Sequence, residues 1–196
     1  GYDVIAFDRY NSDNNFGWLN KSKYKKDIEF YLGDIRDYDS VNKVVTKSSS
    51  VLHLAALIGI PYSYLSPLAY LRTNIEGSYN VLEACKNTDL QNIIITSTSE
   101  VYGSATKTPM NEDHRVIGQS PYSASKIGAD QLALSYYNSF DLPVKIVRPF
   151  NVYGPRQSTR AIIPTIINQV INNKKNIYLG NTTTKRDYTY VSDTCD

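Results

Sequence analysis

The sequence has few of the features that mark membrane, disulfide-stabilised or metal-binding proteins. None of its apolar runs reaches the ~18 residues that a membrane-spanning helix needs, and its first residues lack the basic-then-apolar layout of a signal peptide. Its two cysteines, Cys85 and Cys195, and its two histidines, His53 and His114, are not spaced as metal ligands or as a disulfide framework. We therefore expect no membrane partner, no metal site and a reducing, cytoplasmic environment.

Neither sign of charge dominates the chain. Twenty-one basic and 19 acidic residues give a formal net charge of +2, and the basic residues are scattered apart from "KSKYKK" at 21–26. A surface for nucleic acid or anionic lipid usually needs a concentrated basic patch. We expect no nucleic-acid partner and interpret the lysine cluster as a solvated surface.

Apolar segments of strand length alternate with segments of helical periodicity. Continuous apolar strands that are each followed by a helix are typical of a parallel sheet with helices on both faces. The sequence therefore predicts an α/β, doubly wound, Rossmann-type fold. The expected strands are "YDVIAF" (2–7), "SVLHLAA" (50–56), "NIIITST" (92–98) and "VKIVRPF" (144–150), and the expected helices lie within 66–87 and 120–140.

The glycine-rich phosphate-binding turn of such folds, G-x-G-x-x-G or a variant, does not occur in the sequence. If "YDVIAFD" is the second strand of the fold, that turn lies upstream of Gly1. We therefore expect a fragment, with an incomplete NAD-binding domain at 1–155 and the start of a substrate-binding region at 156–196.

Carboxylates follow two of the expected strands. Asp8 ends the first strand, where doubly wound sheets place an acidic side chain that accepts hydrogen bonds from the adenosine ribose. A carboxylate there also repels a 2′-phosphate, which favours NAD over NADP, although the neighbouring Arg9 weakens this preference. Asp34, beside the apolar Ile35, suits the edge of an adenine.

Tyr122 and Lys126 carry the clearest chemical signal. They lie four residues apart in "PYSASK", a segment with proline near its start and helical periodicity after it, so they share one helix face. An ammonium beside a phenol favours the phenolate and lowers the tyrosine pKa. Tyr122 is therefore predicted to act as a general base near neutral pH.

The order of "STSEVYG", "PYSASKIGADQL", "RPFNVYGPRQ" and "RDYTYV" along the chain resembles the extended short-chain dehydrogenase/reductases that act on nucleotide sugars. The resemblance covers essentially the whole sequence. Three further segments, "YNSDNNFGWLN", "HLAALIGIPYSYLSP" and "GPRQSTRAIIPTIINQV", look most like the configuration-retaining UDP-N-acetylglucosamine 4,6-dehydratases of bacterial legionaminic-acid-type pathways. The implied reaction converts a UDP-N-acetylhexosamine to its 4-keto-6-deoxy derivative, with NAD as a bound cofactor.

The resemblance implies roles for four catalytic residues. Tyr122 takes the proton of the sugar 4-hydroxyl, and Lys126 lowers the tyrosine pKa and holds the nicotinamide ribose. Thr98 hydrogen-bonds the 4-oxygen, and Glu100 removes the C5 proton. Because residues two apart in a strand share a face, we expect Thr98 and Glu100 to point to one side. Ser99 stands where dTDP-glucose 4,6-dehydratases have an acidic residue, so Glu100 is expected to serve the leaving 6-hydroxyl as well.

Further ligands and partners are implied in the same way. The nucleotide-sugar substrate is expected to meet Asn151 and Arg186 through its phosphates and the backbone of Ala161 and Ile162 through its base. A homodimer is expected to pack through the helices that start near Ser66 and Ser120. Additional cofactor contacts are implied at Leu54, Ala55, Ala56, Thr73 and Val152, although the two alanines equally suit tight helix packing.

Three other interpretations remain open. A UDP-glucuronate decarboxylase or a C4 epimerase of the same superfamily would share most of these residues, although an epimerase usually has a small or neutral residue at the position of Glu100. A non-catalytic NAD-binding regulator could keep the fold while losing Tyr122 or Lys126, and this chain keeps both.

His53, inside an apolar strand, is interpreted as a core histidine with its hydrogen bonds satisfied.

Overall fold

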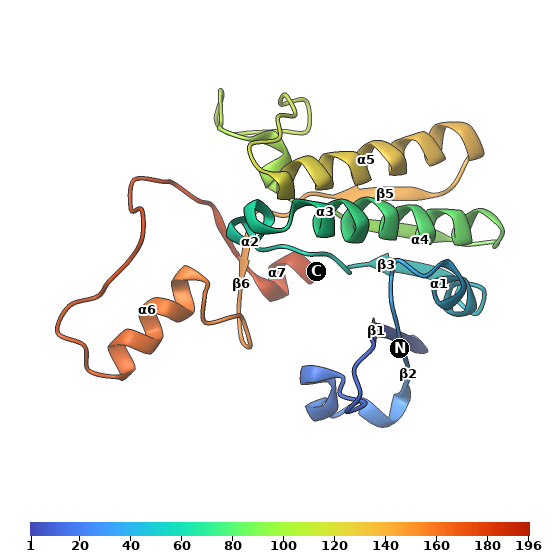
Figure 1. The fold of residues 1–196 in the computed structure, drawn as a ribbon, viewed down its shortest axis with the longest axis horizontal. Helices are drawn as coiled ribbons and strands as arrows, with labels where there is room; N and C mark the ends of the chain where they lie inside the picture. The colour runs from blue at the N-terminus through green and yellow to red at the C-terminus, as the bar shows by residue number, and fades with distance from the viewer. The chain divides into compact units, whose positions relative to one another are not determined.

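The computed structural model describes residues 1–196, which divide into two compact units, 1–148 and 149–196. The first unit holds five strands and the helices between them (Figure 1). The sequence predicts that residues 1–155 bind NAD and that residues 156–196 begin the substrate-binding region. This division of function stays a prediction.

The first unit begins with two parallel strands. Strand β1 (Val4–Arg9) pairs with β2 (Ile28–Gly33), and Arg9 lies opposite Gly33. Between them are two short 3₁₀ helices, η1 (Gly17–Lys21) and η2 (Lys25–Asp27). Helix α1 (Tyr38–Val45) follows β2, and its N-cap is Asp37, whose side chain accepts a hydrogen bond from the amide of Asp39.

Three further strands form a parallel sheet in the order β3-β4-β5, with bounds Ser50–His53, Asn92–Thr96 and Val144–Val147. Parallel strands joined by helices confirm the predicted α/β, Rossmann-type class. Within residues 1–196, β1 and β2 form one sheet and β3, β4 and β5 form another, with no strand pairing between the two sheets.

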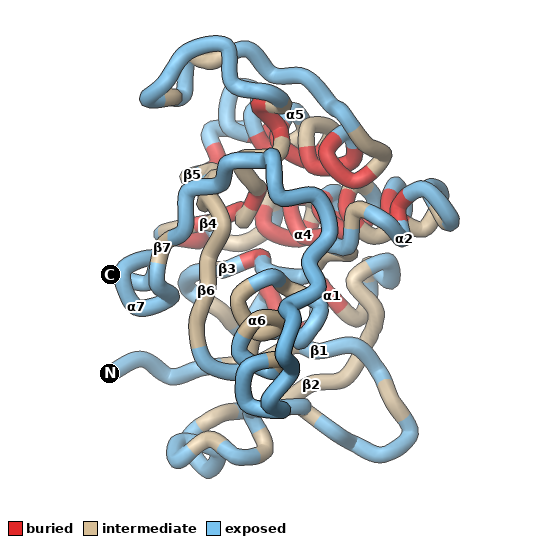
Figure 2. The backbone as a smooth tube through the Cα atoms, turned by 90° about the vertical axis from the view of Figure 1, so that its left-hand side faces the viewer, coloured by how far each residue is buried: buried red, intermediate tan, exposed pale blue.

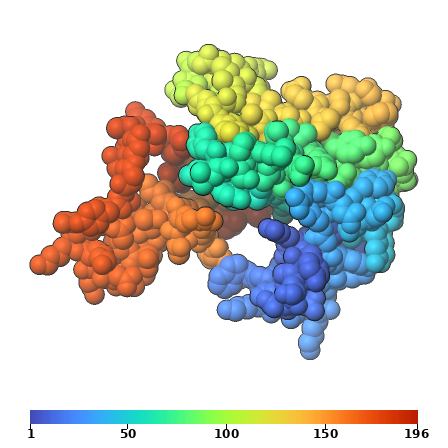
Figure 3. All heavy atoms as spheres, viewed as in Figure 1, coloured from blue at the N-terminus to red at the C-terminus, as the bar shows by residue number.

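The two segments predicted as helical, 66–87 and 120–140, form helices, and a short helix that the sequence does not predict precedes the first of them. From Ile60 the chain forms α2 (Ile60–Leu65), α3 (Pro67–Tyr70), a π-helical segment η3 (Leu71–Glu76) and α4 (Gly77–Lys86). The longest helix, α5 (Pro121–Phe140), starts with a capping box in which the side chain of Ser120 accepts from the amide of Ser123 at 3.1 Å. Helices α2 and α3 lie against the first turns of α5, as the adjoining blue-green and yellow atoms of Figure 3 show.

The core lies between α1, α4, α5 and one face of the three-stranded sheet, where the buried segments of Figure 2 gather. Ile93 and Ile95 are fully buried on that face, and the register places His53 opposite Ile95, so the histidine is buried as well. On the opposite face of the sheet Leu52 is 62% exposed. Helices of this unit thus cover the face of the sheet that carries Ile93 and Ile95.

The second unit is smaller. Strand β6 (Asn151–Tyr153) pairs in parallel with β7 (Tyr188–Tyr190), and the unit also contains α6 (Ile162–Ile171) and α7 (Val191–Cys195). None of the helices in either unit has the length and apolar character needed to cross a membrane.

Candidate active site

The segment "STSEVYG" leaves the sheet earlier than the sequence predicts. Strand β4 ends at Thr96, and a 3₁₀ helix, η4, spans Ser99–Tyr102. Thr98 is its N-cap, because its Oγ1 accepts a hydrogen bond from the amide of Glu100 at 3.2 Å. The expectation that Thr98 and Glu100 share one face of a strand is therefore wrong, since a threonine hydroxyl that caps a turn ends the strand before it.

The turn nevertheless brings both residues to Tyr122. The phenol of Tyr122 hydrogen-bonds the Thr98 side chain, and the Glu100 carboxylate is close enough for its charge to act on the phenol. Tyr122 lies in the first turn of α5, is 7% exposed, and meets the ring of Tyr70 edge-on with centroids 6.2 Å apart. Three of the four predicted catalytic residues thus lie together within the first unit.

The acidity of Tyr122 differs from the prediction. Burial raises its pKa, the hydrogen bond to Thr98 lowers it, and the negative charge of Glu100 raises it further, with a net rise. The expectation that Lys126 lowers this pKa is wrong for the chain alone. The phenol form of Tyr122 therefore prevails at neutral pH.

Lys126 lies one turn after Tyr122 on the buried face of α5, as the four-residue spacing predicts. Lys126 is 3% exposed, and its ammonium donates a hydrogen bond to the carbonyl oxygen of Thr96 at 2.6 Å. Burial lowers the pKa of Lys126, whereas the nearby Asp130 carboxylate raises it. The lysine thus ties α5 to the end of β4, beside the residues that follow that strand.

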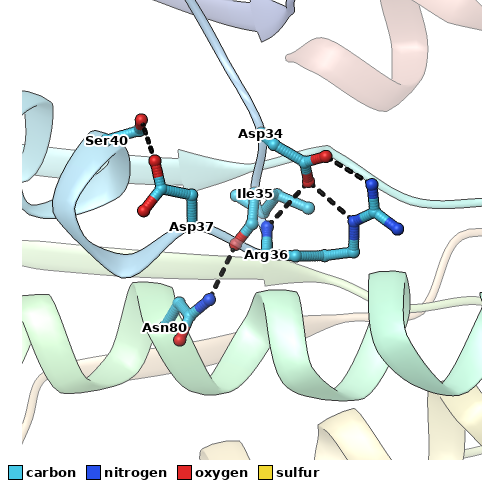
Figure 4. Close-up of polar contacts among 6 residues, drawn as sticks. All are labelled: Asp34, Ile35, Arg36, Asp37, Ser40 and Asn80. Atoms are coloured by element: carbon cyan, nitrogen blue, oxygen red, sulfur yellow. Dashed lines mark hydrogen bonds and ion pairs between the residues drawn. The ribbon is translucent and has the colours of Figure 1, made fainter.

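The end of β2 forms a second polar cluster (Figure 4). Arg36 donates to Asp34 through its backbone amide and through its side-chain Nε, both at 2.9 Å, so the two side chains face each other. The hydrogen bond from the guanidinium lowers the pKa of Asp34 to about 2, although burial opposes the shift. A surface hollow of about 390 Å³ adjoins this pair, lined by Asp34, Arg36, Asp37, Arg72 and Glu76.

Ile35, beside Asp34, is held by α4. The side-chain amide of Asn80 donates to the Ile35 carbonyl at 3.0 Å (Figure 4). A Cβ at Gly77 would come within 2.8 Å of the Ile35 side chain, so glycine allows the helix to approach. The sequence contained Arg36, Gly77 and Asn80 but offered no signal that they support Asp34 and Ile35.

Asn74, which sequence reasoning missed, anchors the loop after β3. Its side chain accepts from the amide of Leu57 at 2.8 Å and donates to the Leu57 carbonyl and to Ser125 Oγ, both at 2.9 Å. A buried asparagine with both ends bonded to one residue fixes the backbone of that residue. The predicted cofactor contacts Leu54, Ala55 and Ala56 precede Leu57 in this loop, and Thr73 precedes Asn74 in η3.

Asp8 lies near the end of β1 and is exposed, with its Oδ1 accepting from the backbone amide of Arg9 at 2.7 Å. His53 is 4% exposed and its Nε2 lies 3.0 Å from Ser78 Oγ, which confirms the prediction of a satisfied core histidine.

The remaining predicted ligands belong to the second unit. Asn151 and Val152 open β6, Ala161 is the N-cap of α6 and Ile162 its first residue, and Arg186 is exposed two residues before β7. The amide of Asn151 donates to the carbonyl of Asp187 at 3.1 Å, which joins two of these segments. Their roles toward substrate and cofactor stay predictions.

Comparison with known proteins places these residues in a family. The model of the family described as GDP-mannose 4,6 dehydratase matches residues 1–196. A dTDP-D-glucose 4,6-dehydratase of Dictyostelium discoideum is 36% identical over 203 residues, which cover 97% of this chain and 47% of that protein.

Two solved structures share the fold. A double mutant of the dTDP-glucose 4,6-dehydratase from Streptomyces venezuelae, solved with NAD bound, matches with a TM-score of 0.88 at 26% identity over 98% of this chain and 60% of that one. A UDP-N-acetylglucosamine 4-epimerase from Methanobrevibacter ruminantium, in complex with UDP-N-acetylmuramic acid, matches with a TM-score of 0.87 at 30% identity over 98% and 62%. The chain thus spans about half to three fifths of the length of these proteins.

Proposed function

Because the chain belongs to the GDP-mannose 4,6-dehydratase family, we propose that it is the catalytic part of an NAD-dependent nucleotide-sugar 4,6-dehydratase, with UDP-N-acetylglucosamine as its substrate. The observation that carries the proposal is the meeting of Tyr122, Thr98 and Glu100 at the junction of η4 and α5. A phenol, a hydroxyl and a carboxylate at one place can move two different protons of one sugar.

Each of the three groups has a role in this reaction. Tyr122 accepts the proton of the sugar 4-hydroxyl, while Thr98 hydrogen-bonds the same oxygen and orients it. With a carbonyl at C4, the C5 proton becomes acidic, and the Glu100 carboxylate removes it. The protonated Glu100 then gives a proton to the departing 6-hydroxyl, since the hydroxyl of Ser99 is too weak an acid for that task.

The residues at the strand ends fit a dinucleotide. Asp8 and Asp34 offer carboxylates at the carboxyl ends of paired parallel strands, where such ligands bind, and the exposed Leu54 and Ala55 follow β3. In the proposal Asp8 holds the adenosine ribose, Asp34 and Ile35 meet the adenine, and Lys126 holds the nicotinamide ribose. The cofactor site of the first unit is completed in this proposal by Leu54, Ala55, Ala56 and Thr73. Val152, in the second unit, keeps its predicted role as a cofactor contact. When bound, oxidised NAD supplies the hydride acceptor and a positive charge that favours the phenolate form of Tyr122.

The substrate is proposed from the resemblance of the sequence, and the match to a UDP-N-acetylglucosamine 4-epimerase supports it. Asn151 and Arg186 would bind the pyrophosphate, for which the planar guanidinium is well suited, and the backbone of Ala161 and Ile162 would meet the base. That epimerase match also makes a UDP-sugar 4-epimerase the second candidate function.

The test uses the full-length protein with UDP-N-acetylglucosamine and mass spectrometry of the product. The dehydratase forms a sugar nucleotide lighter by one water with no net consumption of NAD. Recovery of a product of unchanged mass with inverted C4 would refute the dehydratase and support the epimerase. No reaction with any nucleotide sugar, together with retained NAD binding, would support a regulator.

A Glu100→Gln variant separates the two proton transfers. It should still oxidise C4 but stall before water is lost, because a neutral amide cannot remove the C5 proton. The matched control is Glu112→Gln, the same substitution at an exposed loop position, which should behave as wild type. Normal turnover of Glu100→Gln would show that another group is the C5 base.

We also propose that the protein is a homodimer that packs through the helical segment 67–86 and α5. Four apolar side chains on these elements are 39–54% exposed: Leu71, Tyr79, Leu134 and Tyr137. Light scattering should give twice the protomer mass, and Leu71→Glu should shift the protein to monomer because it places a charge in the contact. A monomeric wild-type protein at micromolar concentration would contradict the proposal.

A further inference from the structure

Helix α5 carries a third polar residue in line with Tyr122 and Lys126. Asp130 follows Lys126 by four residues, so all three side chains lie on one face of the helix. The Asp130 side chain is 1% exposed and accepts a hydrogen bond from Arg148 Nε at 2.9 Å. Arg148 directly follows β5 and its side chain is 17% exposed, so this is a largely buried ion pair.

The same guanidinium reaches the turn that carries Glu100. Arg148 Nη1 donates to the hydroxyl of Tyr102 at 3.2 Å, and its central carbon lies 5.2 Å from the centroid of that ring. Tyr102 is 4% exposed and is the last residue of η4, two residues after Glu100. Arg148 therefore connects α5, the end of β5 and η4.

Stability alone does not account for this arrangement. A buried ion pair adds little to stability compared with apolar residues of the same volume, because both charges lose their hydration. In addition, the second carboxylate oxygen of Asp130, Oδ1, is buried and has no hydrogen-bond partner. The ion pair fixes the orientation of the planar, rigid Arg148 guanidinium. That orientation in turn fixes the position of the Tyr102 hydroxyl, to which the guanidinium donates.

The turn itself needs such an anchor. A four-residue 3₁₀ helix has few and poorly aligned hydrogen bonds of its own, and η4 is fixed at its start by the Thr98 cap. At its other end, the fully buried Val101 and the hydroxyl of Tyr102 hold it. A displacement of about 1 Å of a catalytic group can slow a reaction by about 100-fold, so the position of this turn matters for Glu100.

We propose that Arg148, oriented by Asp130, is a positioning residue that acts through Tyr102. It holds the Glu100 carboxylate at a fixed position relative to the Tyr122 phenol. The inference rests on the proposed function, since it assigns Arg148 to the step in which Glu100 removes the C5 proton. It predicts that damage to the link slows water elimination more than it slows C4 oxidation.

The sharpest variant is Tyr102→Phe, which removes one hydroxyl and keeps the ring and its packing. In rapid-mixing experiments on full-length protein with UDP-N-acetylglucosamine, the variant should oxidise C4 within about threefold of the wild-type rate, while elimination slows by about 10-fold or more. The reduced nicotinamide and the 4-keto sugar that still carries its 6-hydroxyl should therefore accumulate. Tyr178→Phe, which removes the same hydroxyl from a side chain that is 75% exposed, is the matched control.

Two further variants test the rest of the link. Arg148→Lys keeps the charge but loses the planar fork, and Asp130→Asn keeps the shape but loses the charge that orients it. Both should reproduce the selective loss of elimination. Equal slowing of both steps in Tyr102→Phe, or no change in either, would overturn the proposal.

A second measurement does not depend on turnover. Because Glu100 raises the pKa of Tyr122, Glu100→Gln should lower that pKa, as followed by NMR of tyrosine ring carbons assigned with Tyr122→Phe. In the Tyr102→Phe background the same substitution should have a smaller effect, because Glu100 has moved. An undiminished effect would overturn the positioning role, whereas failure of the wild type to release water would refute only the proposed function.

Discussion

His53 should make the stability of the protein depend on pH between about 6.5 and 4. The residue is 4% exposed and lies on the helix-covered face of β3. The hydroxyl of Ser78 donates its hydrogen to the carbonyl of Asn74 at 2.7 Å, so at 3.0 Å it can only accept from His53 Nε2. The buried ring is therefore the neutral tautomer with its proton on Nε2.

Burial lowers the pKa of His53 from 6.5 to about 4, and the positive charge of Lys126 contributes to the shift. In the unfolded chain the same imidazole takes up a proton near pH 6.5, so between these pH values the unfolded state binds one proton more than the folded state. Stability from this group is thus complete above pH 6.5 and is lost as the pH falls toward 4. The slope of ~1.4 kcal/mol per pH unit gives a total loss of about 3 kcal/mol for this one group.

Urea unfolding at a series of pH values, compared between wild type and His53→Gln, measures the effect. The difference between the two proteins removes the contribution of carboxylates that titrate in the same range. His114→Gln, the same substitution at a partly exposed position, is the matched control. The same slope for wild type and His53→Gln, or an NMR titration of His53 near its ordinary pKa, would refute the reasoning.

Two further predictions concern the cluster at the end of β2. The carboxyl of Asp34 should titrate near pH 2 by NMR, and Arg36→Ala should return its pKa toward 3.8. Stability from this pair is present above about pH 3.8 and lost toward pH 2, and it is small because both side chains are more than a third exposed. Gly77→Ala should displace Ile35, which its Cβ would meet at 2.8 Å, and weaken NAD binding several-fold in calorimetric titration. Gly180→Ala, where no atom lies within 4 Å, should bind as wild type, and equal binding by the two variants would contradict a role for Ile35.

The features that the sequence predicts correctly are local ones. The start of α5 follows from Ser120 and Pro121, whose side chains set the first turn, and the shared face of Tyr122 and Lys126 follows from their spacing. The 3₁₀ turn at Ser99–Tyr102 departs from the predicted strand because Thr98 bonds the backbone amide of Glu100. Such a threonine, two residues before the amide that it accepts from, is a local signal for a turn.

The contacts that support the site are not local, and no single-sequence pattern reports them. Asn74 bonds Leu57, 17 residues earlier, and Ser125, 51 residues later. Arg148 bonds Asp130 and Tyr102, which are 18 and 46 residues away. The partners of each pair come together only when the helices pack over the sheet, so residues close in the sequence carry no record of the contact.

In the proposed reaction the pKa of Tyr122 depends on the neighbouring residues and on the cofactor, and the first proton transfer depends on that pKa. The sequence predicts that Lys126 lowers this pKa, but the ammonium hydrogen-bonds Thr96 and lies near the opposite charge of Asp130. Burial and Glu100 therefore prevail, and the phenol keeps its proton. In the proposed reaction Tyr122 would become a base when another positive charge enters the site, as the oxidised nicotinamide of the proposed cofactor would. The pKa of Tyr122 should accordingly be lower with oxidised NAD bound than with reduced NAD bound, as measured by NMR titration of the full-length protein. Equal pKa values in the two states would show that the charge of the cofactor does not act on Tyr122.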